Sequence, residues 1–566
     1  MNSASKWCLG STLFLASFCA FFKPVAAADA PASNAIDAVW PSPFGMGSCA
    51  ARSKDLDSWI PQMTEIGIHN IRGTSGTGWR GVPTTSFTSL DNNLDYLRAH
   101  NVVSGGIFFV GRGKDKRGFP LDDLPGWTDH VTAMVGHTKG KIVNWELWNE
   151  PPNGTGKQTA ADYAKYVVAS YDAAKKANPD CLIGLSAKSV HINYLDQAIA
   201  AGAKNHFDYI TLHPYETFGT SVNVPGFEPV FMSIVPTLRK MLAARNPEKI
   251  NAPVILTEIG MDAGKQGPEK QARAIVKCYT MGIAQGMTCI QWFEGRDGDS
   301  GPMGIITAKG DKRPSYFALG ALIKALGQRP TYVGWLQFND KHYGFVFQGE
   351  KGPVLVTWAR VGTTDEIDLG ESLPITDTVT QKSETASKLS LGENPLIVEG
   401  VPAKLLSLAK ENKTKPFPWG GDYTSAKSVS ITYGEKTEEK GLHTRAGDQI
   451  AADVLAYGGN ARVGNLPGGQ AFLVDPNFLS YTPTPIEIAI VCRRNPKNEP
   501  AKIHIEYEAP PETKKTTELE IPDNKDWYTA KWKITDAQFV SMYGFNFRID
   551  TGKYYIQSVT VTKLDK

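Results

Sequence analysis

Residues 141–152, KIVNWELWNEPP, begin like a buried strand and end in an amide, a carboxylate and two prolines. Proline lacks the backbone N–H that a strand donates to its neighbour, so we expect Pro151 and Pro152 to end the strand. Asn149 and Glu150 are then left at the rim of a sheet. The stretch predicts either a catalytic carboxylate at this rim or a glutamate that only forms a salt bridge at a strand end.

A second stretch, PVILTEIG at residues 253–260, repeats this arrangement. A hydrophobic run again delivers a glutamate, Glu258, at its C-terminal end. If both runs are parallel strands of one sheet, both carboxylates lie at the same edge of that sheet.

The region between residues 44 and 326 alternates short apolar runs with helical patterns, as repeated βα units do. The eight expected strands are 44–48, 68–72, 102–110, 142–149, 182–186, 209–213, 254–258 and 289–293. The clearest expected helices are 90–100, 160–178, 230–245 and 269–285. Eight parallel strands in roughly 280 residues predict a (β/α)₈ TIM barrel. An open doubly wound sheet would have fewer strands and a glycine-rich phosphate turn, which the sequence lacks.

The chain after residue 327 loses the helical period and is expected to contain β-strands alone. We expect a catalytic barrel over 29–329, a small β-sandwich packed on it over 330–412, and a β-sandwich or jelly-roll module over 417–566. The last module is either carbohydrate-binding or a spacer. The predicted fold class is therefore α/β, a barrel followed by C-terminal β-sandwich modules.

The overall charge gives no sign of an anionic partner. Lys and Arg number 60 and Asp and Glu number 58, so the formal net charge is +2. This balance predicts neither nucleic acid nor an anionic membrane surface as a partner. Thirteen tryptophans suit a protein that stacks sugars, although an aromatic-rich core would give the same count.

The N-terminus has the features of a signal peptide over residues 1–28. Lys6 precedes an apolar run at 7–22, and Val25-Ala26-Ala27-Ala28 resembles a cleavage site. We therefore expect a secreted or periplasmic protein without a membrane span after cleavage. The five cysteines after this segment form no C-x-x-C pair, so buried thiols are expected, with one disulfide as the alternative.

Two glutamates at one rim of a barrel are what glycosidic bond cleavage requires. One protonates the leaving oxygen, and the other attacks the anomeric carbon or activates water. A metal site would need further His, Asp or Glu ligands, and His213 is the obvious candidate among them. We expect no metal and no cofactor, with a carbohydrate as the substrate.

These motifs resemble those of the clan A glycoside hydrolases, most closely family 39 and its neighbours. The two main matches are WNEP at 148–151 and TEIG at 257–260. Supporting matches are Ile71-Arg72-Gly73, His213-Pro214-Tyr215, Trp292, GIIT at 304–307 and RPSY at 313–316. The resemblance covers about residues 40 to 410.

The resemblance implies a retaining double displacement, with Glu258 as nucleophile and Glu150 as acid/base. Glu150 must then hold a proton near neutral pH. By the same resemblance, the substrate-binding residues are Asn149, Arg72, His213, Tyr215 and Trp292: Asn149 donates to a sugar hydroxyl, and Arg72 and Tyr215 hold Glu258. For three of these residues a structural role is the alternative: a rim salt bridge for Arg72, a core hydrogen bond for His213 and core packing for Trp292.

Other polar residues near the expected rim have less definite roles. Glu146 lies deeper on the strand that ends in Glu150 and is expected to be a buried structural carboxylate. Asp262, Glu294 and Asp297 lie on rim loops and can contact substrate, and the basic cluster Arg112, Lys114, Lys116 and Arg117 either meets an acidic sugar or is solvated. The alternative function is a non-catalytic carbohydrate-binding protein on a hydrolase scaffold.

Overall fold

A computed structural model describes most of the chain after residue 38. The described residues are 39–49, 52–73, 86–108, 118–152, 158–418, 422–444, 450–451, 459–495, 500–509, 512–524, 526–540 and 545–565. The expected signal peptide and the basic cluster at 112–117 lie outside them. Within these ranges, no helix combines the length and apolarity needed to cross a membrane.

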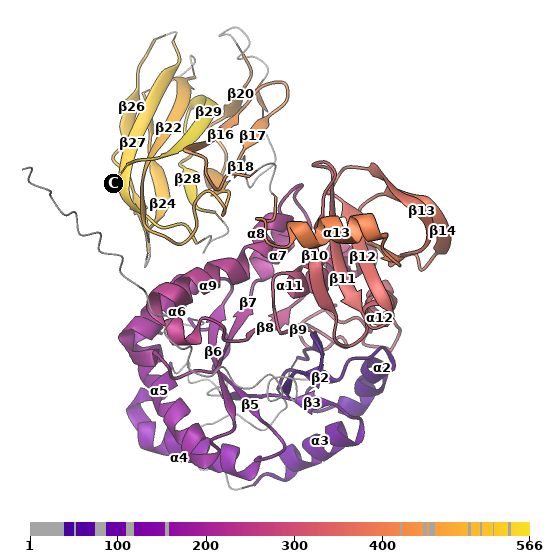
Figure 1. Ribbon diagram of the computed structural model, residues 1–566. Helices are drawn as coiled ribbons and strands as arrows, with labels where there is room; N and C mark the ends of the chain where they lie inside the picture. Colours follow the sequence, from indigo (N-terminus) through magenta and orange to yellow (C-terminus); the bar gives the residue numbers. More distant parts are fainter. Residues whose placement is uncertain are drawn as a thin grey trace, which may run out of the picture.

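The barrel is a parallel sheet whose strands are those the sequence predicts. Its described strands are β1 (Phe44–Met46), β2 (Asn70–Ile71), β3 (Val103–Ser104), β4 (Gly106–Phe108), β5 (Asn144–Leu147), β6 (Leu182–Lys188), β7 (Tyr209–His213), β8 (Val254–Ile259) and β9 (Cys289–Trp292). The sheet runs in the order β3-β2-β1-β9-β8-β7-β6-β5-β4. Only Gly105 separates β3 from β4, so the two act as one barrel strand and close the ring seen in Figure 1.

Helices surround this ring on the outside (Figure 1). They are α2 (Ile60–Glu65), α3 (Thr88–Ala99), α4 (Leu124–His137), α5 (Ala160–Ala177), α6 (Ile192–Ala198), α7 (Tyr215–Ser221), α8 (Glu228–Met232), α9 (Ile234–Arg245), α10 (Ala263–Gln266), α11 (Pro268–Ala284) and α12 (Pro314–Leu326). Local sequence sets their starts. Thr159 caps α5 by accepting the Asp162 N–H at 3.1 Å, and Pro268 opens α11.

A six-stranded antiparallel sheet follows α12. Its strands are β10 (Thr331–Leu336), β11 (His342–Gly349), β12 (Gly352–Ala359), β13 (Asp365–Asp377), β14 (Ser383–Leu391) and β15 (Leu396–Glu399). Alternate residues of one strand face opposite sides: Phe345 and Phe347 join the barrel core, whereas Val346 joins a second core. That second core includes Leu405 and Ala409 of α13 (Ala403–Asn412), so the expectation of β-structure alone after residue 327 is wrong here.

The rest of the chain forms a β-sandwich. One sheet contains β16 (Ser428–Thr432), β17 (Glu438–Lys440), β19 (Ile450–Ala451), β20 (Ala461–Val463), β22 (Thr484–Arg494), β27 (Tyr528–Ala537) and β29 (Tyr554–Lys563). The other contains β18 (Leu442–Thr444), β21 (Gln470–Val474), β24 (Ile505–Ala509), β25 (Glu512–Lys515) and β28 (Phe547–Ile549); β23 (Ala501–Ile503) pairs with β26 (Leu519–Ile521). Side chains from both sheets share one hydrophobic core, as a sandwich requires.

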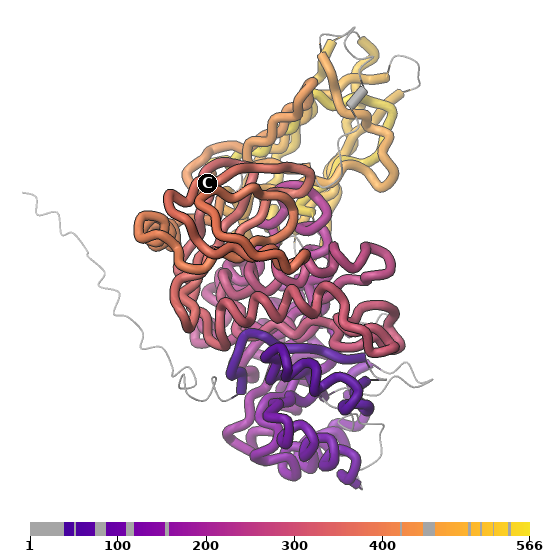
Figure 2. The backbone as a smooth tube through the Cα atoms, turned by 90° about the vertical axis from the view of Figure 1, so that its right-hand side faces the viewer, coloured from indigo at the N-terminus to yellow at the C-terminus, as the bar shows by residue number. Residues whose placement is uncertain are grey.

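The C-terminal sandwich lies against the barrel wall near α8 and α9. Leu473 packs on Phe227 and Val230, and the Thr237 and Ser480 hydroxyl oxygens are 3.1 Å apart. Figure 2 shows the sandwich strands at one end of the molecule and the first barrel helices at the other. The five described cysteines, Cys49, Cys181, Cys278, Cys289 and Cys492, are buried free thiols, as expected.

A buried ion pair joins the barrel helices to the six-stranded sheet. The Lys277 ammonium of α11 lies 3.8 Å from a Glu228 oxygen of α8, and the two side chains are 2% and 0% exposed. The Trp358 indole N–H of β12 donates to the same Glu228 oxygen at 3.2 Å. Burial, the largest effect, raises the pKa of Glu228 and lowers that of Lys277, while each charge opposes the shift of the other.

We expect Lys277→Met to lower the free energy of unfolding by about 3 kcal/mol near pH 8, because Glu228 is left buried without its counter-charge. The loss should be smaller at pH 5. A carboxyl group whose pKa is raised in the folded state stabilises the fold while it is protonated. That stabilisation is lost as the pH rises through the folded-state pKa. Calorimetry at both pH values measures the difference. The control is Lys388→Met, whose 3.5 Å pair with Glu366 is exposed; an equal effect of both substitutions would contradict the assignment.

Candidate active site

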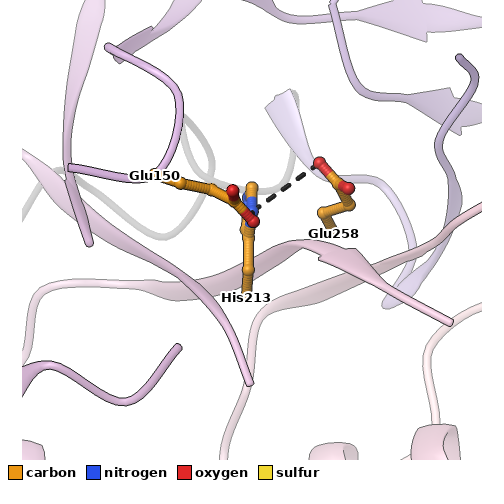
Figure 3. Close-up of side chains that lie close together, drawn as sticks. All are labelled: Glu150, His213 and Glu258. Carbon is orange, nitrogen blue, oxygen red and sulfur yellow. Dashed lines mark hydrogen bonds and ion pairs between the residues drawn. The ribbon is translucent and has the colours of Figure 1, made fainter. Parts of the chain in front are cut away.

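The polar residues that the motifs singled out meet at the C-terminal ends of the barrel strands. Arg72 follows β2, Glu150 follows β5, and Glu258 lies near the end of β8. His213 ends β7, and Tyr215 opens α7 directly after it. Figure 3 shows the side chains of Glu150, His213 and Glu258 pointing toward one another. This rim is where barrel enzymes place their active sites.

The backbone after β5 turns away from the sheet earlier than the prolines require. The strand ends at Leu147, because Trp148 (φ 71°) and Glu150 (φ 53°) adopt the left-handed conformation. Such residues cost about 1–3 kcal/mol each and persist only where their surroundings hold them. The Trp148 N–H donates to the Phe108 carbonyl at 2.7 Å, which fixes the start of this turn. The turn directs the Glu150 side chain toward His213.

Both oxygens of Glu258 accept a hydrogen bond. The Arg72 guanidinium donates to Oε2 through Nη1 at 2.5 Å, and the Tyr215 hydroxyl donates to Oε1 at 2.9 Å. The Glu258 side chain is 18% exposed, so it remains accessible from the rim. The two bonds hold the carboxylate in one orientation.

Glu146 is the buried structural carboxylate that the sequence predicts. It accepts bonds from Arg72 Nε at 2.9 Å and from the hydroxyls of Thr211 at 3.0 Å and Thr257 at 2.9 Å. Burial alone would raise the pKa of Glu146, but the charge of Arg72 and then the contacts of His213 lower it to about 2. Glu146 therefore stays ionised and keeps Arg72 in place.

Arg72 also determines which way the Asn149 amide faces. Its Nη2 donates to Asn149 Oδ1 at 2.8 Å. A guanidinium has donors only, so the amide presents its oxygen to Arg72. The Asn149 NH₂ group is then turned away from Arg72, with its donors directed elsewhere.

His213 connects the buried carboxylate to the rim carboxylate. The Thr257 hydroxyl donates to Glu146, so its oxygen accepts the N–H of His213 Nε2 at 2.9 Å. The other ring nitrogen, Nδ1, is 2.9 Å from Glu150 Oε1 and 3.6 Å from Glu258 Oε2. Figure 3 draws this second contact as a dashed line. The sequence singled out His213 but not this chain of contacts.

The charges around this pair favour a protonated His213 beside an ionised Glu150. Burial and Arg72 alone would lower the pKa of His213, but Glu258, Glu146 and Glu150 raise it to about 9. Burial alone would raise the pKa of Glu150, but His213 and then Arg72 bring it below the ordinary value. Both directions oppose a protonated Glu150 in the free protein, because folding brings His213 to 2.9 Å from its carboxylate.

Trp292 does not offer a surface to a sugar, and that expectation is wrong. Its side chain is fully buried, edge-to-face with Phe218 at a centroid distance of 6.1 Å. The three acidic loop residues also have structural contacts: Asp262 caps α10, Asp297 forms an ion pair with Arg313 at 2.7 Å, and Glu294 accepts the Cys49 N–H.

The contacts of Thr211 and Thr257 with Glu146 were not predicted from the sequence. Thr211 precedes His213 by two positions on β7, so the period-two alternation of a strand places both on the inner face. That signal could have identified Thr211. Nothing in the local sequence indicated that both threonines bind Glu146 of another strand.

The site offers three donors to a metal ion, since one atom each of Glu150, His213 and Glu258 lies within 4.8 Å of the others. The Arg72 guanidinium contacts Glu258, however, and His213 Nδ1 is already at hydrogen-bonding distance from Glu150. A divalent cation would face the charge of Arg72 and would have to replace that hydrogen bond. The arrangement suits proton transfer and nucleophilic attack better than metal binding.

Comparison with known proteins identifies the fold. No protein-family model matches the sequence, and no curated protein matches it. A solved family 39 glycoside hydrolase from Bacteroides cellulosilyticus matches at 16% identity and a TM-score of 0.50, over 63% of this chain and 80% of that one. At such low identity the likeness shows the fold alone, which is consistent with the parallel barrel described above.

Two further solved structures are less similar. A GH51 α-L-arabinofuranosidase from Thermotoga petrophila is 10% identical, with a TM-score of 0.45, over 60% of this chain and 89% of that one. A glucosidase from Croceicoccus marinus is 11% identical, with a TM-score of 0.42, over 92% of this chain and 96% of that one.

We expect Glu146→Gln to lower the free energy of unfolding by about 3 kcal/mol, because it removes the buried charge that Arg72 and the two threonines contact. Thermal unfolding followed by calorimetry measures this loss. Glu366→Gln is the matched control, since its carboxylate is 63% exposed and should contribute under about 1 kcal/mol. Similar midpoints for the two variants would show that Glu146 is not structural.

Proposed function

We propose that this protein is an exported glycoside hydrolase that cleaves O-glycosidic bonds of a poly- or oligosaccharide with retention of configuration. One observation carries the proposal: Glu150 and Glu258 come from different barrel strands, yet an oxygen of each lies within 4.8 Å of the other and of His213 Nδ1. Retaining glycosidases separate their two carboxyl groups by about 5–5.5 Å, whereas inverting enzymes need about 6.5–9.5 Å to admit a water molecule. The short separation favours retention.

In this proposal Glu258 is the nucleophile. Arg72 and Tyr215 each donate to one of its oxygens, so the carboxylate is held in one orientation and aligned for attack. An oxygen of Glu258 forms a bond to the anomeric carbon while the bond from that carbon to the leaving oxygen breaks. The product of this step is a covalent glycosyl-enzyme.

Glu150 is the acid and then the base. It gives its proton to the leaving oxygen in the first step, and in the second it takes a proton from the water that attacks the anomeric carbon and releases Glu258. The asparagine beside it contributes as well: with Oδ1 bonded to Arg72, the Asn149 NH₂ group donates to the sugar hydroxyl next to the anomeric carbon.

His213 supplies the proton that Glu150 needs. Their contact is 2.9 Å, so one proton transferred along it converts the charged pair into a neutral imidazole and a carboxylic acid. A bound sugar displaces water from the rim, and desolvation favours the neutral pair over the charged pair. Substrate binding thus prepares Glu150 as an acid.

The proposed function also assigns roles to the N-terminal segment and to the β-domains. The N-terminal 28 residues act as a signal peptide that directs the chain to the periplasm or the medium. Residues 29–329 are the catalytic domain, 330–412 stabilise the barrel wall, and 417–566 either bind carbohydrate or act as a spacer. The partner is a carbohydrate, and neither a metal nor another cofactor takes part.

The alternative is a binding protein that retains the scaffold without turnover. A screen of the purified protein against aryl glycosides and polysaccharides distinguishes the two: a hydrolase releases product, whereas a binding protein only retains the polymer. For any substrate that is cleaved, proton NMR of the first product gives its anomeric configuration. An initially inverted anomer would contradict the proposed mechanism.

Azide separates the roles of the two carboxylates. We expect Glu150→Ala to lose most turnover but to regain it with azide on an aryl glycoside with a good leaving group, because azide needs no general base. The product should be a glycosyl azide of retained configuration. Glu258→Ala should instead give the inverted azide, since azide enters from the side that the nucleophile vacates. NMR of the products checks both, and the opposite pair would show that the roles are exchanged.

A further inference from the structure

A second cavity lies on the outer wall of the barrel, away from the carboxylates. It is a groove of about 730 Å³ between α2, α12 and the six-stranded sheet. Figure 1 shows α2 and α12 on the flank of the barrel on which this sheet lies. The volume is within the range of about 300–1,000 Å³ typical of ligand sites. The groove shares no residue with the candidate active site.

The floor of the groove is apolar and carries an exposed aromatic ring. Ile66, Ile323 and Ile397 line it together with Phe317, which is 47% exposed. Among the described residues one other large hydrophobic side chain, Phe338, is similarly exposed at 45%, and it lies outside the groove. An exposed ring inside a cavity is the feature that a flat, partly apolar ligand needs.

A buried neighbour supports this ring. Tyr316 is 2% exposed, and its hydroxyl donates to the Gln62 carbonyl at 2.8 Å. Its ring lies edge-on to Phe317 at a centroid distance of 5.4 Å. Phe317 therefore projects from a rigid part of α12.

The rim of the groove is polar, with charges of both signs. Its charged side chains are Glu65, Lys324, Glu350, Lys351 and Glu399, and its neutral polar ones include Thr376, Gln381 and Ser383. Three carboxylates and two ammonium groups nearly cancel, so the groove does not attract an anionic polymer. Hydroxyls of a neutral ligand can donate to the carboxylates and accept from the lysines.

The groove is also long. Its lining runs along α12 from Tyr316 to Ala325, which is about 14 Å at 1.5 Å per residue, and continues past the helix end to Gln328. A lining of this length fits an extended chain better than a compact ligand.

We propose that this groove binds a segment of a neutral polysaccharide, with Phe317 stacking on the apolar face of a sugar ring and the polar rim bonding its hydroxyls. The choice of a saccharide rests on the proposed glycosidase function. The groove holds the polymer on the enzyme while the barrel rim cleaves it. Phe317 is the residue that the proposal depends on most.

Native gel electrophoresis through mixed-linkage β-glucan, arabinoxylan, linear arabinan and galactomannan tests this proposal, with all proteins carrying Glu258→Gln so that no polymer is cleaved. We expect at least one polymer to retard the protein and Phe317→Ala to weaken that retardation about five-fold. Ala321→Trp, which fills the groove, should have the same effect. Phe338→Ala is the matched control and should leave the retardation unchanged.

Several outcomes would overturn the proposal. If neither groove substitution changes the retardation, the polymer binds elsewhere on the protein. If no polymer retards the protein, the groove is not a polysaccharide site. A change of sedimentation coefficient with Phe317→Ala, without a change in retardation, would show that a second copy of the chain occupies the groove.

A groove that binds no polysaccharide can be distinguished from a protein that is not a glycosidase. With Glu258 intact, Phe317→Ala should lower kcat/KM about five-fold on the polymer that retards the protein and leave an aryl glycoside unaffected. Loss of both activities would show a structural effect. If the intact protein cleaves nothing, the glycosidase proposal fails, while gel retardation still reports on the groove.

Discussion

The candidate site depends on the three-way hydrogen bonding of Arg72. One guanidinium contacts Glu146 inside the barrel, Glu258 at the rim and the Asn149 amide between them. A planar fork with five donors can serve three acceptors in fixed directions, which a lysine ammonium cannot do with the same geometry. The segments that end β2, β5 and β8 are thereby held in one arrangement, and the donor-only guanidinium determines how the amide is oriented.

Glu146 makes this arrangement possible although it is too deep to touch a substrate. A buried guanidinium without a counter-charge would be strongly destabilising, and Glu146 provides that charge on the side away from the rim. Through Thr257, the same carboxylate also fixes which nitrogen of His213 carries a hydrogen toward the core. The other nitrogen then faces Glu150, so a buried structural charge controls where a proton can move at the surface of the site.

The six-stranded sheet extends the barrel in two ways. One face adds Phe345, Phe347 and Trp358 to the barrel core, and the other closes on α13. Where the sheet meets α12 it leaves a groove with an exposed phenylalanine. A β-domain that is required for packing thus also creates a surface that the barrel alone would not have.

The barrel and its two rim glutamates were predictable from the sequence, because each barrel strand is an apolar run and the helices between them have the 3.6-residue period. Proline and glycine after 149–150 and 258–259 marked the strand ends. α13 was missed because its ten residues are short and its apolar side is defined only by the sheet that covers it. The sugar-binding role of Trp292 was predicted wrongly, because the local sequence around a tryptophan at a strand end is the same whether its ring faces a ligand or a helix.

Only the tertiary structure determined which charged groups meet at the site. Glu146, Glu150 and His213 come from two strands that are far apart in the sequence, and the pKa of each depends on charges that only folding brings close to it. Local sequence specifies which residues end a strand, because that depends on backbone chemistry. It does not specify which charges meet, because the electrostatic interaction depends on distances across the barrel.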